Sequence, residues 1–271
     1  MQTPETLGII AGNGAYPRLV ADAARAAGVS QISAAAFKGE TDPVLTERVD
    51  QIEWLRVGQL SRLISFFRDQ GIHHAMMAGQ IAPKNLFDLR PDWKALLILA
   101  RLKERNAESI FTAIAEELAR HEIELLPATT FLENHVASEG LMAGPRLSRR
   151  AQGDVDFGWK IAKEIARLNI GQTVVVKNGT VLAVEGFDGT NETIQRGGKL
   201  AGKGAVVVKV AKPNQDMRFD VPVIGAETVR LAASANIGII AVEAARTLLL
   251  EKEILIEAAN RSNVSLLGRK E

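Results

Sequence analysis

The stretch that decides the fold class runs from residue 7 to residue 37 and reads LGIIAGNGAYPRLVADAARAAGVSQISAAAF. It opens with a short apolar run that ends in Gly12-Asn13-Gly14, and an alanine-rich helical pattern follows from Leu19 to Ala27. After a glycine that ends this helix, Gln31 to Phe37 has the composition of a second buried strand. A strand, a glycine turn, a helix and another strand in this order are typical of a parallel sheet with helices on its faces.

The same alternation continues to about residue 126. Further strands are expected at Gln51–Leu55, His73–Ala78 and Glu122–Leu126. Further helices are expected at Gln59–Gln70, Asp92–Lys103 and Ala107–Arg120. The sequence therefore predicts an α/β fold whose first domain, residues 1–130, is Rossmann-like with a parallel sheet.

Periodicity lapses between residues 131 and 150, where Gly140, Gly144, Pro145 and a basic cluster from Arg146 to Arg150 predict a linker. A long loop within one domain is the alternative interpretation. Residues 151–271 are then predicted to form a distinct C-terminal mixed α/β domain, the catalytic one. Its clearest elements are a helix from Val155 to Leu168 and a hairpin that turns at Asn178-Gly179, a pair that accepts positive φ angles.

Composition excludes several classes of protein. Lys plus Arg number 33 against 32 for Asp plus Glu, so the basic excess typical of general nucleic-acid binding is absent. The sequence has no cysteine, which excludes disulfides, thiolate nucleophiles and cysteine-based zinc sites. Neither a secretory signal nor an apolar run of the ~18–20 residues that span a bilayer is visible, so a cytoplasmic protein is expected.

Two glycine loops follow strands of the predicted parallel sheet. Gly12-Asn13-Gly14 lies between a strand and a helix, where main-chain N–H groups can bind a phosphate, and a tight turn is the alternative reading. Pro17 stands where a dinucleotide fingerprint has its third glycine, and Glu40 is poorly placed as a ribose-binding acid, which counts against an NAD-dependent oxidoreductase. Gly79-Gln80 follows another strand and is expected at the same sheet edge.

Polar residues gather at two turns of the second half. Asp188 and Thr190 lie where a strand gives way to a helix, so each is a candidate ligand or simply a helix cap. The loop from Lys212 to Pro222 contains Asp216 and Asp220, which could hold Mg²⁺ together with Asp188, whereas a solvated charged loop is the alternative. Basic side chains that could balance a phosphate are Arg196, Lys209, Lys212 and Arg218.

Six motifs together resemble one family. They are GNGAYP at residues 12–17, AGQ at 78–80, DLRPD at 88–92, GDVDFG at 153–158, VEGFDGT at 184–190 and KPNQDMRFDVPVIG at 212–225. In this order they resemble the UDP-2,3-diacylglucosamine pyrophosphatases of lipid A biosynthesis, of the two-domain type that is unrelated to calcineurin-like phosphoesterases. The resemblance spans almost the whole chain.

The resemblance implies a Mg²⁺-dependent hydrolase that converts UDP-2,3-diacylglucosamine to UMP and 2,3-diacylglucosamine 1-phosphate between its two domains. It places the essential carboxylate on Asp220, with Asp216 as the competing choice, and the metal ligands on these two residues and Asp188. The expected substrate-binding residues are Gly12, Asn13, Gly14, Gly79, Gln80, Asp188, Gly189, Thr190, Asn191, Lys209, Lys212, Gln215 and Arg218.

A protein that binds or senses a UDP-sugar or dinucleotide without cleaving it is the alternative from another class. The paired carboxylates count against it, because a binder of diphosphates gains nothing from them without a metal. The acyl chains need apolar cover, for which Trp93, Leu96, Leu97 and Leu99 are candidates, although an ordinary core helix is the favoured reading of that segment. Transient contact with the inner-membrane surface follows from a lipid substrate, and a homodimer is left open.

Overall fold

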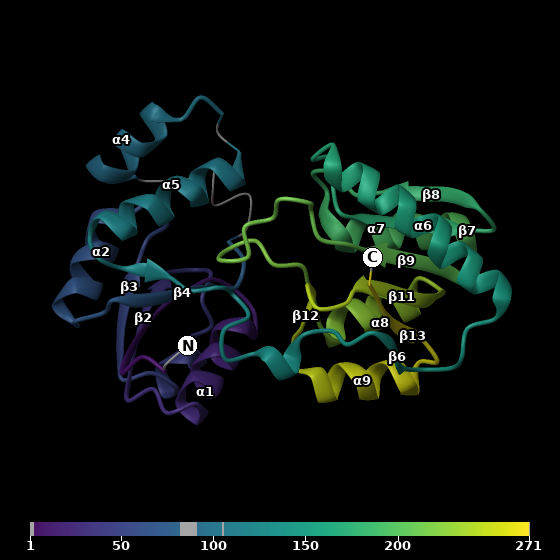
Figure 1. The fold of residues 1–271 in the computed structure, drawn as a ribbon, viewed down its shortest axis with the longest axis horizontal. Coiled ribbons are helices and arrows are strands. Elements are labelled where there is room, and N and C mark those ends of the chain that lie inside the picture. The colour runs from purple at the N-terminus through teal and green to yellow at the C-terminus, as the bar shows by residue number, and fades with distance from the viewer. Residues whose placement is uncertain (1–2, 82–90, 105, 271) are drawn as a thin grey trace. The chain divides into compact units, whose positions relative to one another are not determined.

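The computed structural model describes residues 3–81, 91–104 and 106–270. These residues form two compact units. The first comprises the chain up to Leu132 together with the short segment Asp216–Asp220, and the second comprises Glu133–Gln215 and the chain from Val221 onward. Each unit contains its own main sheet, as the ribbon in Figure 1 shows.

The sheet of the first unit is parallel throughout, as the sequence predicts. Its strands lie in the order β3-β2-β1-β4-β5. From β1 the chain adds β2 and β3 on one side of the sheet, and then β4 and β5 on the other side of β1. Every strand therefore ends at the same edge of the sheet, which is where ligands of open parallel sheets bind. The strands are β1 (Thr6–Ala11), β2 (Gln31–Phe37), β3 (Gln51–Leu55), β4 (His74–Ala78) and β5 (Glu124–Leu125).

Helices cover both faces of this sheet (Figure 1). The helix α1 begins at Tyr16, earlier than the apolar pattern indicates, because Pro17 suits a first helical turn. The face opposite α1 carries one core shared by α2, α4 and α5, with Phe67, Ile98 and Leu118 among its buried members. The helices are α1 (Tyr16–Ala26), η1 (Pro43–Glu47), α2 (Leu60–Asp69), α4 (Trp93–Arg101) and α5 (Ala107–Arg120).

The second unit is built on a mixed sheet in the order β6-β13-β11-β9-β7-β8. Its hairpin turns at Asn178 and Gly179 with φ angles of 52° and 69°, which confirms the predicted turn. A separate parallel pair is formed by β10 (Val223–Ile224) and β12 (Leu248–Leu249). The main strands are β6 (Gly140–Ala143), β7 (Thr173–Lys177), β8 (Thr180–Val184), β9 (Ala205–Lys209), β11 (Ile237–Glu243) and β13 (Ser265–Arg269).

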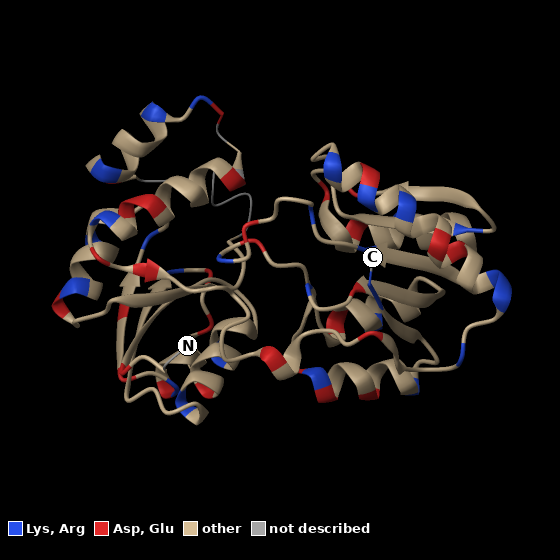
Figure 2. Ribbon diagram, viewed as in Figure 1, with Lys and Arg blue, Asp and Glu red and all other residues tan. Residues whose placement is uncertain are grey.

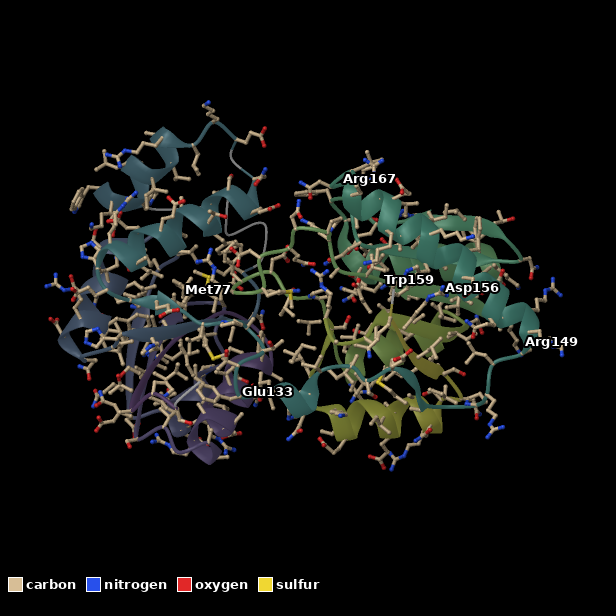
Figure 3. The ribbon with its side chains drawn as sticks, viewed as in Figure 1. Met77, Glu133, Arg149, Asp156, Trp159 and Arg167 are labelled. Carbon is tan, nitrogen blue, oxygen red and sulfur yellow. The ribbon has the colours of Figure 1, made fainter. Side chains whose placement is uncertain are left out.

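Successive valine side chains of β7 pack into two different hydrophobic cores, one on each face of the sheet. Val174 and Val176 pack with Trp159 of α6, whereas Val175 packs with the helices of the opposite face. Trp159 and Asp156 lie on α6 in Figure 3, and Arg269 pairs with Asp156 while its guanidinium lies over the Trp159 ring. The helices are η2 (Glu133–His135), α6 (Arg149–Arg167), α7 (Gly189–Ala201), α8 (Ala226–Ser234) and α9 (Lys252–Arg261).

The segment 131–150, predicted as a linker, is structured within the second unit from Glu133 onward. Its strand β6 is short and pairs with β13, where Gly144 approaches so closely that a Cβ atom would lie 2.3 Å from the Val264 carbonyl oxygen. The helix α6 starts at Arg149 because Ser148 caps it, its hydroxyl accepting from the Ala151 N–H at 3.2 Å. Partners distant in sequence thus order a stretch that lacks local periodicity.

Charged side chains gather on the helices and loops, while the strands are largely uncharged (Figure 2). None of the helices in the described part of the chain is both long and apolar enough to cross a lipid bilayer.

Candidate functional site

The two glycine loops of the first unit touch each other at the carboxyl edge of the sheet, as predicted. The Gly12 N–H donates to the Ala78 carbonyl at 2.7 Å, and the Asn13 N–H donates to the Gln80 carbonyl at 2.7 Å. A Cβ atom on Gly12 would lie 2.6 Å from the Gln80 oxygen, and one on Gly79 would lie 2.5 Å from the Asn13 oxygen. Both glycines are therefore required for contact between the loops.

This contact changes the expected role of the first loop. Since the N–H groups of Gly12 and Asn13 donate to the second loop, they are not the phosphate donors that the glycine pattern predicts. Gly14 is exposed and has a φ of 91°. The side chains of Asn13 and Gln80 are exposed beside it, so these polar groups are the ones that can face a ligand here.

Tyr16 ties this edge to the acidic segment. Its hydroxyl donates to the carbonyl of Ala128, just beyond β5, and the Ala128 N–H donates to the Met217 carbonyl at 2.7 Å. Burial raises the pKa of the Tyr16 hydroxyl far above its ordinary value, so the group stays protonated and remains a donor. Nothing in the sequence patterns singled out Tyr16, which lies only three residues beyond Asn13.

The segment Asp216–Asp220 packs with the first unit although its chain neighbours belong to the second. Phe219 joins the core beneath α4 and α5, and its ring lies 5.7 Å from the ring of Phe111. The Asp220 N–H donates to the Asp216 carbonyl at 2.9 Å, which closes one tight turn. The two candidate carboxylates are thus fixed on the first unit by an aromatic anchor between them.

Asp216 and Arg218 form a two-pronged ion pair. The Arg218 Nε and Nη2 atoms donate to the two carboxylate oxygens at 2.9 and 2.6 Å. These bonds hold the pKa of the Asp216 carboxyl below its ordinary range and raise the pKa of the guanidinium, so both groups stay charged. Asp216 therefore acts first as the group that orients Arg218.

A second polar cluster lies at the start of α7. The buried Lys209 ammonium donates to the Thr190 hydroxyl at 2.8 Å, and this hydroxyl donates to the Glu185 carboxylate at 2.7 Å. Glu185 also accepts from the Gln172 N–H at 3.0 Å. The structure thus brings together two predicted binding residues, Thr190 and Lys209, around a buried carboxylate that the sequence interpretation left out.

Asp188 does not cap α7, which was the alternative reading of this residue. Its carboxylate accepts from the Gly186 N–H at 3.0 Å and pairs with Arg196 at 3.0 Å. Phe187, between these glycine and aspartate positions, is 87% exposed. The N-terminus of α7 is therefore bare of side-chain caps, and Gly189 and Asn191 lie in its first turn.

The loop that contains Lys212 and Gln215 begins beside Glu243, a buried carboxylate at the end of β11. Gln215 accepts from the Lys212 N–H at 2.8 Å. Glu243 accepts from the Ala211 N–H at 2.8 Å, and both of its carboxylate oxygens accept from the Lys163 ammonium at 3.0 Å. A charged residue directly after the apolar run of a parallel strand was the available signal for Glu243.

The predicted site residues divide between the two units. Those in the first unit are Gly12, Asn13, Gly14, Gly79, Gln80, Asp216, Arg218 and Asp220. Those in the second unit are Asp188, Gly189, Thr190, Asn191, Lys209, Lys212 and Gln215. Residues 88–90 of the DLRPD motif lie outside the described residues, and Asp92 of that motif caps α4.

The donor set fits a magnesium ion that is bound together with its substrate. In the described ranges no three histidine or acidic side chains converge on one point. Asp216 is paired with Arg218 and Asp188 with Arg196, so these two carboxylates already have cationic partners within the protein. Mg²⁺ commonly takes only one or two carboxylates and completes its shell with water and phosphate oxygens.

Comparison with known families accounts for both halves of the chain. The family model of the LpxI N-terminal domain matches residues 6–135, and that of the LpxI C-terminal domain matches residues 138–267. The chain belongs to the LpxI family. A UDP-2,3-diacylglucosamine pyrophosphatase LpxI from Caulobacter vibrioides is 29% identical over 273 residues, which cover 97% of this chain and 96% of the relative. The family resemblance drawn from the six motifs is thereby confirmed.

Proposed function

We propose that this protein hydrolyses the diphosphate of UDP-2,3-diacylglucosamine to UMP and 2,3-diacylglucosamine 1-phosphate, with Mg²⁺, in lipid A biosynthesis. The similarity to the Caulobacter vibrioides LpxI over nearly the whole length of both chains supports the substrate. The geometry that carries the proposal is the acidic segment Asp216–Asp220, anchored through Phe219 and Ala128 beside the glycine loops. A carboxylate and an oriented guanidinium in one turn suit diphosphate cleavage.

The residues of the acidic segment take separate roles in this proposal. Asp220 holds the metal or orients the attacking water, and Asp216 fixes the guanidinium of Arg218. Arg218 retains further N–H donors, because a guanidinium carries five of them, and these bind a phosphate oxygen. A bound Mg²⁺ would supply charge neutralisation on the diphosphate.

The second unit contributes a cationic phosphate site in the same proposal. Lys209 is buried, and the Thr190 hydroxyl joins its ammonium to the buried Glu185 carboxylate. The bare N-terminus of α7 adds main-chain N–H groups that favour an anion. Thr190→Val would remove the bridging hydroxyl with little change in volume, so we expect a higher KM and an unchanged fold.

The test is UMP release from UDP-2,3-diacylglucosamine with Mg²⁺, with EDTA, and by the variants Asp220→Asn and Asp216→Asn. We expect Asp220→Asn to abolish release while retaining substrate binding, and Asp216→Asn to raise KM by freeing Arg218. Folded wild-type protein that binds the substrate without releasing UMP would refute the enzyme and favour a UDP-sugar binding protein. Full activity in EDTA would refute the proposed dependence on Mg²⁺ but not the proposed hydrolysis.

A further inference from the structure

The helix α4 (Trp93–Arg101) exposes large apolar side chains to solvent. Trp93, Leu96 and Leu97 are 63%, 54% and 46% exposed, and their spacing puts them on one face. The helix buries Ile98 against the core. A helix at a protein surface normally turns its apolar stripe inward. The helix does pack on the core through Ile98, but the interpretation as core is wrong for the three exposed side chains.

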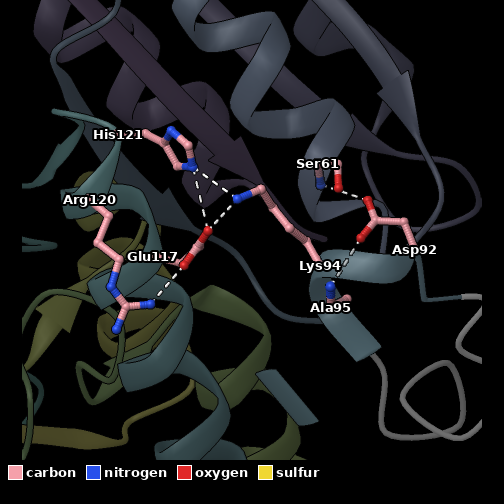
Figure 4. A network of polar contacts seen from close by, with 7 residues as sticks. All are labelled: Ser61, Asp92, Lys94, Ala95, Glu117, Arg120 and His121. Carbon is pink, nitrogen blue, oxygen red and sulfur yellow. Dashed lines mark hydrogen bonds and ion pairs between the residues drawn. The ribbon is translucent and has the colours of Figure 1, made fainter. Parts of the chain in front are cut away.

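A polar network fixes the orientation of α4, as Figure 4 shows. The Lys94 ammonium pairs with Glu117 of α5 at 2.5 Å and contacts His121 at 3.0 Å. Asp92 accepts from its own helix, at the Ala95 N–H, and from the Ser61 N–H of α2 at 2.6 Å. Because these bonds hold the polar side of α4 against the protein, its apolar side is held outward.

Basic residues flank the exposed stripe. Arg101 ends α4 and Lys103 follows it, and both are exposed. Glu104 adds one opposite charge, and its carboxylate accepts from the Asn106 amide at 3.3 Å. A tryptophan and two leucines beside two cations match the interface of an anionic bilayer, where indole lies at the headgroups, leucine enters the acyl boundary and the cations meet phosphates.

We infer that the outward face of α4, made of Trp93, Leu96 and Leu97 with Arg101 and Lys103 at its end, docks the protein on an anionic lipid bilayer. The inference rests on the proposed function, because a diacyl substrate resides in such a bilayer. The acidic segment belongs to the same unit, and its Phe219 shares a core with Ile98 of α4. Docking through α4 therefore holds the unit that carries Asp220 at the surface from which the substrate is taken.

Binding is tested first without substrate, by sedimentation of the full chain with phosphatidylethanolamine vesicles that contain phosphatidylglycerol. We expect Leu96→Gln/Leu97→Gln to weaken partitioning about tenfold or more. Arg101→Gln/Lys103→Gln should remove the preference for anionic vesicles, at about fivefold for each cation. The matched control is Leu168→Gln/Ile170→Gln, which changes two exposed apolar residues of the second unit and should leave binding unchanged.

Depth of insertion is tested by brominated lipid, which quenches indole fluorescence on contact. The test uses a Trp54→Phe background, because Trp54 on β3 is only half-buried. This protein should be quenched and its Trp93→Phe derivative should not, because the remaining Trp159 is buried in the second unit. Wild-type protein that neither sediments with anionic vesicles nor shows quenching overturns the inference. The same holds if the control variant loses binding as strongly as Leu96→Gln/Leu97→Gln.

Activity separates docking from the other occupants of this face. With substrate in vesicles, UMP release by Leu96→Gln/Leu97→Gln should fall about tenfold, and with substrate in non-ionic detergent it should match wild type. An equal loss in detergent would assign the face to the acyl chains of one substrate molecule and overturn docking. A lipid-free wild-type dimer that the variant converts to monomer would assign the face to self-association and also overturn docking.

These outcomes are distinct from those of the proposed function. UMP release by wild type without vesicle binding refutes docking alone. Vesicle binding without UMP release refutes the proposed hydrolysis alone.

Discussion

Replacing Glu243 by alanine should destabilise the second unit strongly and loosen the start of the loop that leads to Asp216. The carboxylate is only 4% exposed and has three partners. It accepts two contacts from Lys163 at 3.0 Å and one from the Ala211 N–H at 2.8 Å, and Arg246 lies 3.8 Å away. Arg246 also donates to the Lys212 carbonyl at 3.2 Å, so the same cluster sets the path of that residue.

The magnitude follows from what the substitution leaves behind. Alanine removes the carboxylate partner of the Lys163 ammonium and the acceptor of the Ala211 N–H, and removal of one partner from a buried ion pair costs about 3–5 kcal/mol. Glu243→Gln keeps an acceptor for one of the two donors, so its cost should be nearer about 1–3 kcal/mol. Glu257→Gln is the matched control, because Glu257 pairs with Arg261 on an exposed helix face, where loss of the pair costs below about 1 kcal/mol.

Urea unfolding of the three variants measures the free energies, and hydrogen exchange of the Ala211 amide reports the loop directly. We expect exchange at Ala211 to accelerate in Glu243→Ala, with a raised KM for the substrate and a smaller change in kcat. A cost for Glu243→Ala no larger than that of Glu257→Gln, with protected exchange at Ala211, would refute the claim that this carboxylate organises the loop.

Four further substitutions test the first unit and α6. Gly79→Ala should lower the free energy of unfolding in urea by about 1–3 kcal/mol, because its Cβ atom would lie 2.5 Å from the first loop. Gly153→Ala lies in a helix with no atom near the added Cβ, and it should raise the free energy of unfolding by about 0.5–1 kcal/mol. Equal effects of the two substitutions would contradict this. Tyr16→Phe leaves the Ala128 carbonyl without its donor and should cost about 1–3 kcal/mol, with unchanged stability as the contrary result. Hydrogen bonds from its cationic partners, led by Lys94, lower the pKa of Glu117. The stability that this carboxylate contributes is therefore present above its unfolded pKa of about 4.3 and is lost as pH falls through its folded pKa. In urea unfolding measured against pH, Glu117→Gln should reduce this loss of stability at acid pH, and an unchanged slope would contradict the prediction.

Local pattern was enough to predict most elements of both sheets. The strand Gln31–Phe37 and the helix Ala107–Arg120 have the bounds that periodicity indicates, and the Asn178-Gly179 turn follows from backbone preference alone. The strand β6 was missed because its order depends on β13, more than a hundred residues later. Its own four residues carry too little pattern to predict a strand.

The pairing of the site's charged side chains and the orientation of α4 could not be predicted from the sequence, for two different physical reasons. The loop Lys212–Pro222 was recognisable as a candidate site from its composition, but the pairing of Asp216 with Arg218 depends on side-chain geometry. The segment of α4 offers enough apolar residues for a core helix, and only Lys94 and Asp92, through partners on α5 and α2, decide which side faces out. Interactions distant in the chain therefore determine the orientation of α4, whereas the pair of Asp216 and Arg218 is local and depends on side-chain conformation.

The placement of Asp216–Asp220 with the first unit has a consequence for synthesis of the chain. The first unit is discontinuous, so its ring contact at Phe111 and its hydrogen bond at Ala128 have no partners until Phe219 and Met217 have left the ribosome. Domains that are continuous in sequence fold in order from the N-terminus during translation, whereas this unit must wait for more than half of the second one to be made. In a nascent chain arrested near residue 215, the first unit would therefore lack the Phe219 ring that contacts Phe111. Asp216 and Asp220 would be the last residues to join this unit.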